Sequence, residues 1–198
     1  MARAGARRHR ALVAAGILVG VGGLATAGAL AAWRASPPAA VAVSPAASAT
    51  LRLGARAPLD FVLPRLGGGR PLRVRSLLAG HPAVVNVFAS WCPACAAELG
   101  AFARAFRAAD GRVRFLGVDT NDSTPGRALS LLRAAGARYP VVRDSASLAF
   151  ARAYGVADLP VTFFLDARGR VVDEVLGREG TAGLERQVAA LEHGRPTR

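Results

Sequence analysis

The chain has 198 residues, enough for one ordinary domain and an appendage. Hydrophobic residues make up 52% of it, which excludes disorder throughout. Two cysteines are too few for a disulfide-dense scaffold, and His9, His81 and His193 lack neighbouring partners for a zinc site. We therefore expect no metal and no bound cofactor.

The formal net charge is +13, and all 26 basic residues are Arg. Such an excess of positive charge invites a nucleic-acid-binding interpretation. Five of the 26 Arg lie within residues 1–34, and the other 21 are interspersed with all 13 acidic residues in 51–198. No nucleic-acid-binding motif accompanies them. The charge pattern therefore argues against a nucleic-acid partner.

The amino-terminal quarter of the chain divides into three segments. Residues 1–10 form a basic tail, and 11–33 run for 23 positions without a charge, about 34 Å as a helix and enough to cross a bilayer. The positive-inside rule places the tail in the cytoplasm and the rest outside. A transmembrane signal-anchor is predicted, with a cleavable signal peptide as the alternative. Residues 34–50, rich in Pro, Ala and Ser, are typical of a semi-rigid spacer.

Residues 51–198 alternate strand and helix signals. The continuous apolar run 83–89 is typical of a central strand buried on both faces, and the apolar stripe in 93–109 indicates a helix. Asp166–Gly169 is a hairpin turn signal. The predicted strands are 59–63, 72–74, 83–89, 113–118, 141–142, 161–165 and 170–176, and the predicted helices are 93–109, 125–135, 145–154 and 181–191. This order predicts a three-layer α/β/α sandwich with an amino-terminal β-hairpin extension.

Cys92 and Cys95 stand three positions apart, between the buried strand and the following helix. Closing so small a loop restrains the unfolded chain very little, so a structural disulfide explains the spacing poorly. A redox pair explains it well. Cys92 falls at the helix amino terminus, where unpaired N–H groups and the helix dipole favour a thiolate, and Pro93 suits the first helical turn. Cys95, one turn further in, would resolve a mixed disulfide formed by Cys92.

The segment Trp91–Cys95, reading WCPAC after VVNVFAS, resembles the active site of the thioredoxin superfamily, and specifically its TlpA/ResA/CcmG-like (redoxin-type) extracytoplasmic branch. The resemblance spans 54–192 and includes the segments 54–61 and 154–166. It implies a thioredoxin-like fold and thiol-disulfide oxidoreductase activity.

The resemblance also assigns roles. Pro160 is expected to follow a cis peptide bond, with Leu159 presenting its backbone to a substrate strand beside Cys92. Glu98 matches the acidic residue that this branch keeps near its active site, where burial would suit it to proton transfer. Asn86 occupies the place of a buried Asp in cytoplasmic thioredoxins and cannot titrate. The structural alternatives are a surface Glu98, a core Asn86 and, for Trp91, a core aromatic instead of a residue packed over the site.

Some positions depart from the family pattern. Ala94 stands where cytoplasmic thioredoxins have Pro, and Gly100 stands where many relatives have Pro. Pro93 directly after the first Cys resembles the strong oxidant DsbA, which follows it with His. With Trp91 and Leu159, the two residues Pro93 and Ala94 are expected to contact the substrate. Because the dipeptide between the cysteines tunes the redox potential, the direction of electron flow stays open.

The resemblance favours a membrane-anchored, extracytoplasmic reductase of the cytochrome c maturation type. Its substrates would be protein disulfides, with the haem-binding cysteines of apocytochrome c as the suggested case, and a membrane thiol relay would re-reduce it. The alternatives are an oxidase or isomerase of secreted proteins, and a binding module that uses the scaffold without turnover.

Overall fold

The computed structural model describes residues 51–144 and 147–195. The predicted tail 1–10, membrane span 11–33 and spacer 34–50 lie outside this part of the chain. Within it, no helix combines the length and the apolar character that a membrane span requires.

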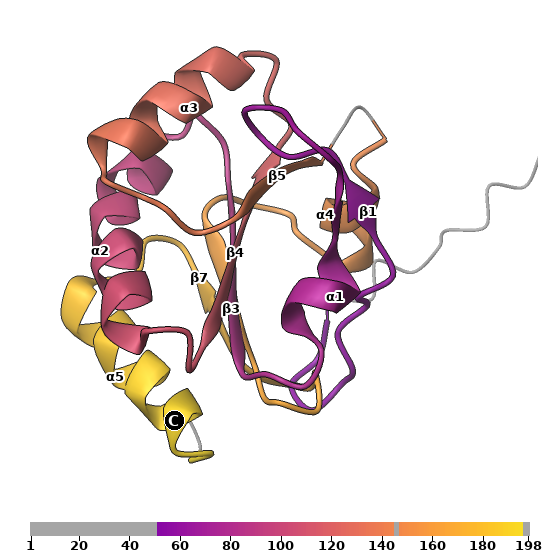
Figure 1. Cartoon of the computed structure of the whole chain (residues 1–198), viewed down its shortest axis with the longest axis vertical. Helices are drawn as coiled ribbons and strands as arrows, with labels where there is room; N and C mark the ends of the chain where they lie inside the picture. Colours follow the sequence, from indigo (N-terminus) through magenta and orange to yellow (C-terminus); the bar gives the residue numbers. More distant parts are fainter. Residues whose placement is uncertain (1–50, 145–146, 196–198) are drawn as a thin grey trace, which may run out of the picture. The chain divides into compact units, whose positions relative to one another are not determined.

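A five-stranded mixed sheet forms the centre of the domain, in the order β5-β4-β3-β6-β7 (Figure 1). The central strand β3 (Ala83–Phe88) runs parallel to β4 (Arg114–Thr120), which is parallel to β5 (Val141–Asp144). On its other side β3 is antiparallel to β6 (Val161–Leu165), which pairs antiparallel with β7 (Val171–Leu176). All six residues of β3 are buried, as the continuous apolar run predicts.

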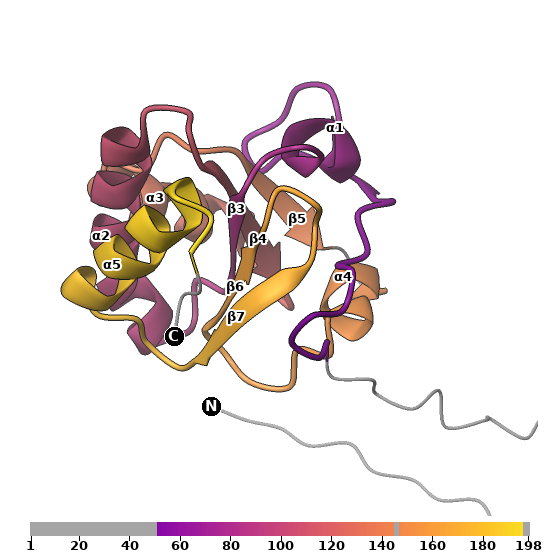
Figure 2. The same cartoon turned by 90° about the horizontal axis from the view of Figure 1, so that it is seen from below.

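Helices cover both faces of this sheet. The helices α2 (Pro93–Ala109), α3 (Pro125–Ala134) and α5 (Thr181–Glu192) lie on one face, and α1 (Val74–Leu78) and α4 (Ala149–Ala153) on the other (Figures 1 and 2). The three-layer α/β/α arrangement is therefore confirmed.

Two apolar cores follow from the two-residue period of the strands. On β3, Val84 and Phe88 belong to the core on the α2 face, whereas Val85 and Val87 belong to the core on the α1 face. Residues at even positions of β3 thus point toward the helix that carries the cysteines. This parity places Asn86 under α2.

The amino-terminal hairpin is present but shorter than predicted. Its strands β1 (Val62–Leu63) and β2 (Leu72–Arg73) pair antiparallel over two residues each. The predicted strand end at Val74 is wrong, because Val74 begins α1. This five-residue helix has no side-chain cap and too few residues for an apolar period, so the sequence alone does not reveal it.

The predicted helix 145–154 is also too long. Leu148 has a left-handed backbone with φ of 50°, so the helix cannot include it, and α4 begins at Ala149. The helix predicted over 93–109 has those bounds in the structure. It starts with Pro93 and ends with Ala109, and the following C-cap residue Asp110 has a left-handed conformation (φ 45°) and precedes Gly111.

This topology brings the sequence motifs to one end of the sheet. Residues 89–92 connect the carboxyl end of β3 to the amino terminus of α2. Because β6 is antiparallel to β3, with Val161 opposite Val87, the residues that precede β6 lie beside this connection. Pro160 therefore lies at the same end of the sheet as Cys92.

Candidate active site

Cys92 and Cys95 form a disulfide at the amino terminus of α2. Cys92 is the N-cap residue, and its Sγ accepts the backbone N–H of Cys95 at 3.1 Å. The same N–H and the helix dipole would stabilise a thiolate at Cys92 after reduction. Cys92 is 5% exposed and Cys95 is fully buried, so an incoming substrate can reach only Cys92. The predicted order of attack, Cys92 first and Cys95 second, agrees with this geometry.

Trp91 is half exposed, so the core-aromatic alternative is wrong. Its indole Nε1–H donates to the backbone carbonyl oxygen of Asn121 at 2.8 Å, which ties the active-site segment to the loop after β4. Trp91, Asn121 and Leu159 line a cleft of about 340 Å³ together with residues of the α4 region. A partly apolar cleft beside the redox cysteine is suited to a polypeptide side chain.

The peptide bond between Leu159 and Pro160 is cis, as the resemblance implies. Leu159 is half-buried and packs against the core that contains both cysteines. The structure thus brings Trp91 and Leu159, two of the predicted substrate-contacting residues, to one cleft. Pro93 and Ala94 are exposed on the first turn of α2 and do not line that cleft.

Glu98 is 1% exposed, so the alternative of a surface carboxylate is wrong. Its Oε1 accepts from Asn86 Nδ2 at 2.8 Å and its Oε2 accepts from the backbone N–H of Glu179 at 2.9 Å. Burial raises the pKa of Glu98 to about 7, although these two hydrogen bonds oppose the shift. A carboxyl group with this pKa can both accept and donate a proton near neutral pH.

Asn86 lies beneath Glu98 and is 1% exposed. Its Nδ2 also donates to Thr162 Oγ1 at 3.3 Å, while its Oδ1 has no hydrogen-bond partner among the described residues. An amide carries a donor for the ionised carboxylate and an acceptor for the protonated carboxyl group. A flip of the Asn86 amide therefore lets it bond to either protonation state of Glu98.

Three residues of this region were missed by the sequence analysis: Asn121, Asp122 and Glu179. Glu179 donates its backbone N–H to Glu98, and Asn121 offers its backbone carbonyl oxygen to Trp91. Any residue type can make these two hydrogen bonds, so the bonds leave no signal in the sequence. Asp122 accepts the backbone N–H of Ser90 at 2.6 Å, just before the cysteine motif. The only sign of Asp122 in the sequence was its position two residues after the end of a buried strand.

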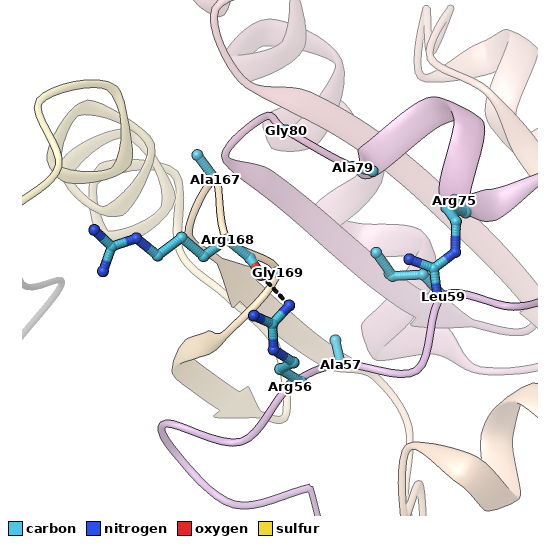
Figure 3. Close-up of a pocket in the computed structure, with 9 residues that line it drawn as sticks. All are labelled: Arg56, Ala57, Leu59, Arg75, Ala79, Gly80, Ala167, Arg168 and Gly169. Atoms are coloured by element: carbon cyan, nitrogen blue, oxygen red, sulfur yellow. Dashed lines mark hydrogen bonds between the residues drawn. The ribbon is translucent and has the colours of Figure 1, made fainter.

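A second cavity, of about 350 Å³, is lined by arginine and lies near the turn between β6 and β7 (Figure 3). Arg56 donates to the backbone carbonyl oxygen of Arg168 at 3.4 Å, and Arg75 forms an ion pair with Asp60. That turn follows β6, so the cavity lies at the end of the sheet opposite Pro160 and the cysteines. Across residues 51–144 and 147–195, no cluster of His, Cys, Asp or Glu could hold a metal ion.

A central parallel strand pair, a Cys-Pro-Ala-Cys disulfide at a helix tip and a neighbouring cis-proline define a thioredoxin-like protein with a redox disulfide site. Residues 52–190 match the model of the Redoxin family. The chain therefore belongs to that family, and the resemblance predicted from the sequence is confirmed.

Curated relatives and solved structures agree with this family. The chain is 33% identical over 118 residues to the thiol:disulfide interchange protein DsbE of Allochromatium vinosum, covering 60% of this chain and 64% of that protein. It is 37% identical over 90 residues to DsbE of Haemophilus influenzae, covering 46% of this chain and 48% of that protein. The matched part is thus less than two thirds of the length of either relative. The structure of a secreted Mycobacterium tuberculosis disulfide oxidoreductase homologous to E. coli DsbE superposes with a TM-score of 0.61 at 27% identity, covering 67% of this chain and 97% of that one.

Proposed function

We propose that this protein is a thiol-disulfide oxidoreductase that exchanges disulfides with other proteins through Cys92 and Cys95. The observation that carries the proposal is the unequal accessibility of the two sulfur-bearing residues at the tip of α2. The cleft lined by Trp91 and Leu159 supports a polypeptide substrate.

The exchange balances as two sequential displacements. In the reduced protein, the Cys92 thiolate attacks one sulfur of a substrate disulfide, which forms a mixed disulfide and releases the other substrate sulfur as a thiolate. Cys95 then loses its proton and attacks Cys92 Sγ. The substrate leaves with both sulfurs reduced, and the protein retains the Cys92–Cys95 disulfide. Two electrons have passed from the protein to the substrate.

Glu98 supplies the base for the second step. Cys95 is fully buried, so its thiol cannot give a proton directly to water. Glu98 follows Cys95 by three positions on α2, and side chains at this spacing share one face of a helix. With a pKa of about 7, Glu98 is partly ionised at neutral pH and can take that proton. The Asn86 amide bonds to Glu98 before and after the transfer.

The direction of electron flow that we propose is reduction of the cytochrome c maturation type, outside the cytoplasm. Its support is the resemblance of WCPAC and its flanking segments to the TlpA/ResA/CcmG-like branch, whose suggested substrate is apocytochrome c. The basic tail 1–10, the uncharged stretch 11–33 and the spacer 34–50 support a membrane anchor, with the donor a membrane thiol relay.

Two experiments test this proposal. The first equilibrates the Cys92–Cys95 pair with glutathione. A reduction potential near the value of about −120 mV found for DsbA would refute the reductase assignment in favour of an oxidase.

Insulin reduction is the activity assay. We expect Cys92→Ser to abolish it. Activity that survives Cys92→Ser would contradict the assignment of the protein as a thiol-disulfide oxidoreductase.

The second experiment identifies the substrate and the location. Cys95→Ser leaves Cys92 able to attack but removes the resolving thiol, so mixed disulfides accumulate in the native host. We expect trapped proteins with haem-binding cysteines in the membrane fraction. If the Cys95→Ser protein is found in the soluble fraction, in mixed disulfides with cytoplasmic proteins, both the extracytoplasmic location and the membrane anchor are refuted.

A further inference from the structure

Besides Glu98, two buried carboxyl groups, Asp119 and Asp122, lie near the segment that leads to Cys92. Asp119 on β4 is 1% exposed and stands in register with Phe88 on β3 and Arg143 on β5. Asp122 follows three residues later, after the end of β4. Neither residue takes part in the exchange steps described above.

Asp122 holds two backbone segments at once. Its Oδ2 accepts the N–H of Ser90 at 2.6 Å, and its Oδ1 accepts the N–H of Thr124 at 2.7 Å. Burial opposes its ionisation, but the hydrogen bonds from Ser90 and Thr124 outweigh burial and keep the pKa of Asp122 below its ordinary value. Asp122 is therefore ionised at neutral pH, with both oxygens occupied.

Asp119 lacks such donors. No N–H or O–H group of the described residues donates a hydrogen bond to either of its oxygens, and Arg143 Nε stands 3.9 Å from Oδ2, beyond hydrogen-bond range. Burial first, and then the charge of Asp122, raises the pKa of Asp119 to about 7, while Arg143 opposes the shift. Asp122 from the loop and Arg143 from β5 are the charged groups that act on it, and its neighbour on β3 is the apolar Phe88.

We propose that Asp119 and Asp122 share one proton and that this pair positions the active-site segment that carries Cys92. While Asp119 is protonated, it brings its own O–H donor to the ionised Asp122, and Asp122 keeps the Ser90 N–H. The Ser90 bond and the bond from Trp91 Nε1–H to Asn121 then hold residues 90–91 against the loop after β4. The guanidinium of Arg143 also donates to the backbone carbonyl oxygen of Asp122 at 3.0 Å, which ties this loop to β5.

Loss of the Asp119 proton changes both the geometry and the charge. Two carboxylates would then face each other in a buried site with one guanidinium at 3.9 Å, and the repulsion would weaken the hold of Asp122 on Ser90. The extra negative charge would also disfavour a thiolate at Cys92. Asp119 is thus a positioning residue that makes the redox pair harder to reduce as the pH rises through neutrality.

This inference rests on the proposed function only in taking Cys92 as the attacking sulfur, so its first test uses the oxidised protein and needs no activity. The backbone amide shifts of Ser90 and Trp91 are followed by NMR in the ¹⁵N-labelled full chain between pH 5 and pH 9. We expect an inflection near pH 7 at Ser90 that persists in Glu98→Gln and disappears in Asp119→Asn.

A second variant, Arg143→Gln, keeps Asp119 titratable but should raise its pKa further. Removing the guanidinium takes away the one group that favours the Asp119 carboxylate, so the inflection must move to higher pH. A wild-type Ser90 amide without an inflection, an inflection that survives Asp119→Asn, or one that vanishes in Glu98→Gln would each overturn the proposal. If Asp119→Asn does not fold, the wild-type, Glu98→Gln and Arg143→Gln titrations still decide it.

The second test links the pair to the disulfide. Asn is a neutral isostere that can donate to Asp122 at every pH, as protonated Asp119 does. Equilibrium with glutathione should show that Asp119→Asn makes the Cys92–Cys95 disulfide about threefold easier to reduce than in wild type at pH 8, with no difference at pH 6. If the ratio of the reduction equilibrium constants of Asp119→Asn and wild type is the same at pH 6 and pH 8, the coupling of Asp119 to Cys92 is refuted. Loss of insulin reduction in Cys92→Ser is measured separately and tests the oxidoreductase function itself.

Discussion

The burial of Glu98 should make the stability of the protein depend on pH in a way that one substitution removes. In the oxidised protein the Glu98 carboxyl group is 1% exposed, and its pKa of about 7 exceeds the value of 4.5 that it has in an unfolded chain. Below pH 4 both states hold the proton and the shift has no effect. As the pH rises from 4.5 to 7 the unfolded chain releases this proton while the folded protein keeps it, so stability is lost.

The size of the effect follows from the shift. About 2.5 pKa units at about 1.36 kcal/mol per unit correspond to roughly 3 kcal/mol, fully developed above pH 8. Gln at this position never ionises. It can accept the Glu179 N–H through its oxygen and donate through Nε2 to Asn86 Oδ1, which has no partner among the described residues of the wild-type protein. Glu98→Gln should therefore gain about 3 kcal/mol over wild type between pH 4 and pH 8.

Urea unfolding of the oxidised wild-type and Glu98→Gln proteins, at pH 4, 6 and 8, measures this difference. Asp119 titrates in both proteins and cancels from the comparison. The control is Glu185→Gln, which makes the same substitution at an exposed position of α5. A Glu98→Gln difference that is constant with pH, or that shrinks as the pH rises, would refute the assignment of Glu98 as a buried carboxyl group with a raised pKa.

Three further predictions concern the neighbouring residues. Asn86→Ala removes a hydrogen bond that favours the Glu98 carboxylate, so the pH profile of insulin reduction should shift to higher pH; an unshifted profile would count against the contact. Trp91→Ala removes both a wall of the cleft and the bond to Asn121, so KM for insulin should rise about tenfold while the rate with a small disulfide changes little; equal losses with both substrates would argue against a substrate-contacting role. Phe88→Ala empties a fully buried site on the α2 face and should cost about 3–5 kcal/mol in urea unfolding, and a loss below about 1 kcal/mol would contradict the packing seen there.

Element types were predictable where the signal is local. The bounds of α2 follow from Pro93 at its start and from Asp110 and Gly111 at its end, because these residues act through their own backbone conformations. The left-handed Leu148 carries no such signal, since Leu rarely adopts that conformation and only the surrounding chain can impose it. The start of α4 was therefore misplaced.

The redox pair is also a local feature. Two cysteines three positions apart, between an apolar run and a helical stripe with Pro93 at its start, place one sulfur at a helix tip in any fold that keeps those elements. The chain itself thus indicated the redox pair and the family, and Cys92 as the attacking residue stays a prediction from the sequence. The same local reasoning carries the prediction of an anchor in residues 11–33, since charge and apolar length act there without partners.

Only the tertiary structure decided how protons are handled around that pair. Glu98 is buried because Asn86, 12 positions away, and Glu179, 81 positions away, close over it, and Asp122 reaches Ser90 across 32 positions. These contacts depend on the register of β3 with β4 and β6 and on the packing of the segment before α5. A pKa shift comes from the removal of water and from the nearest charges, and neither is a property of the chain until the sheet has formed.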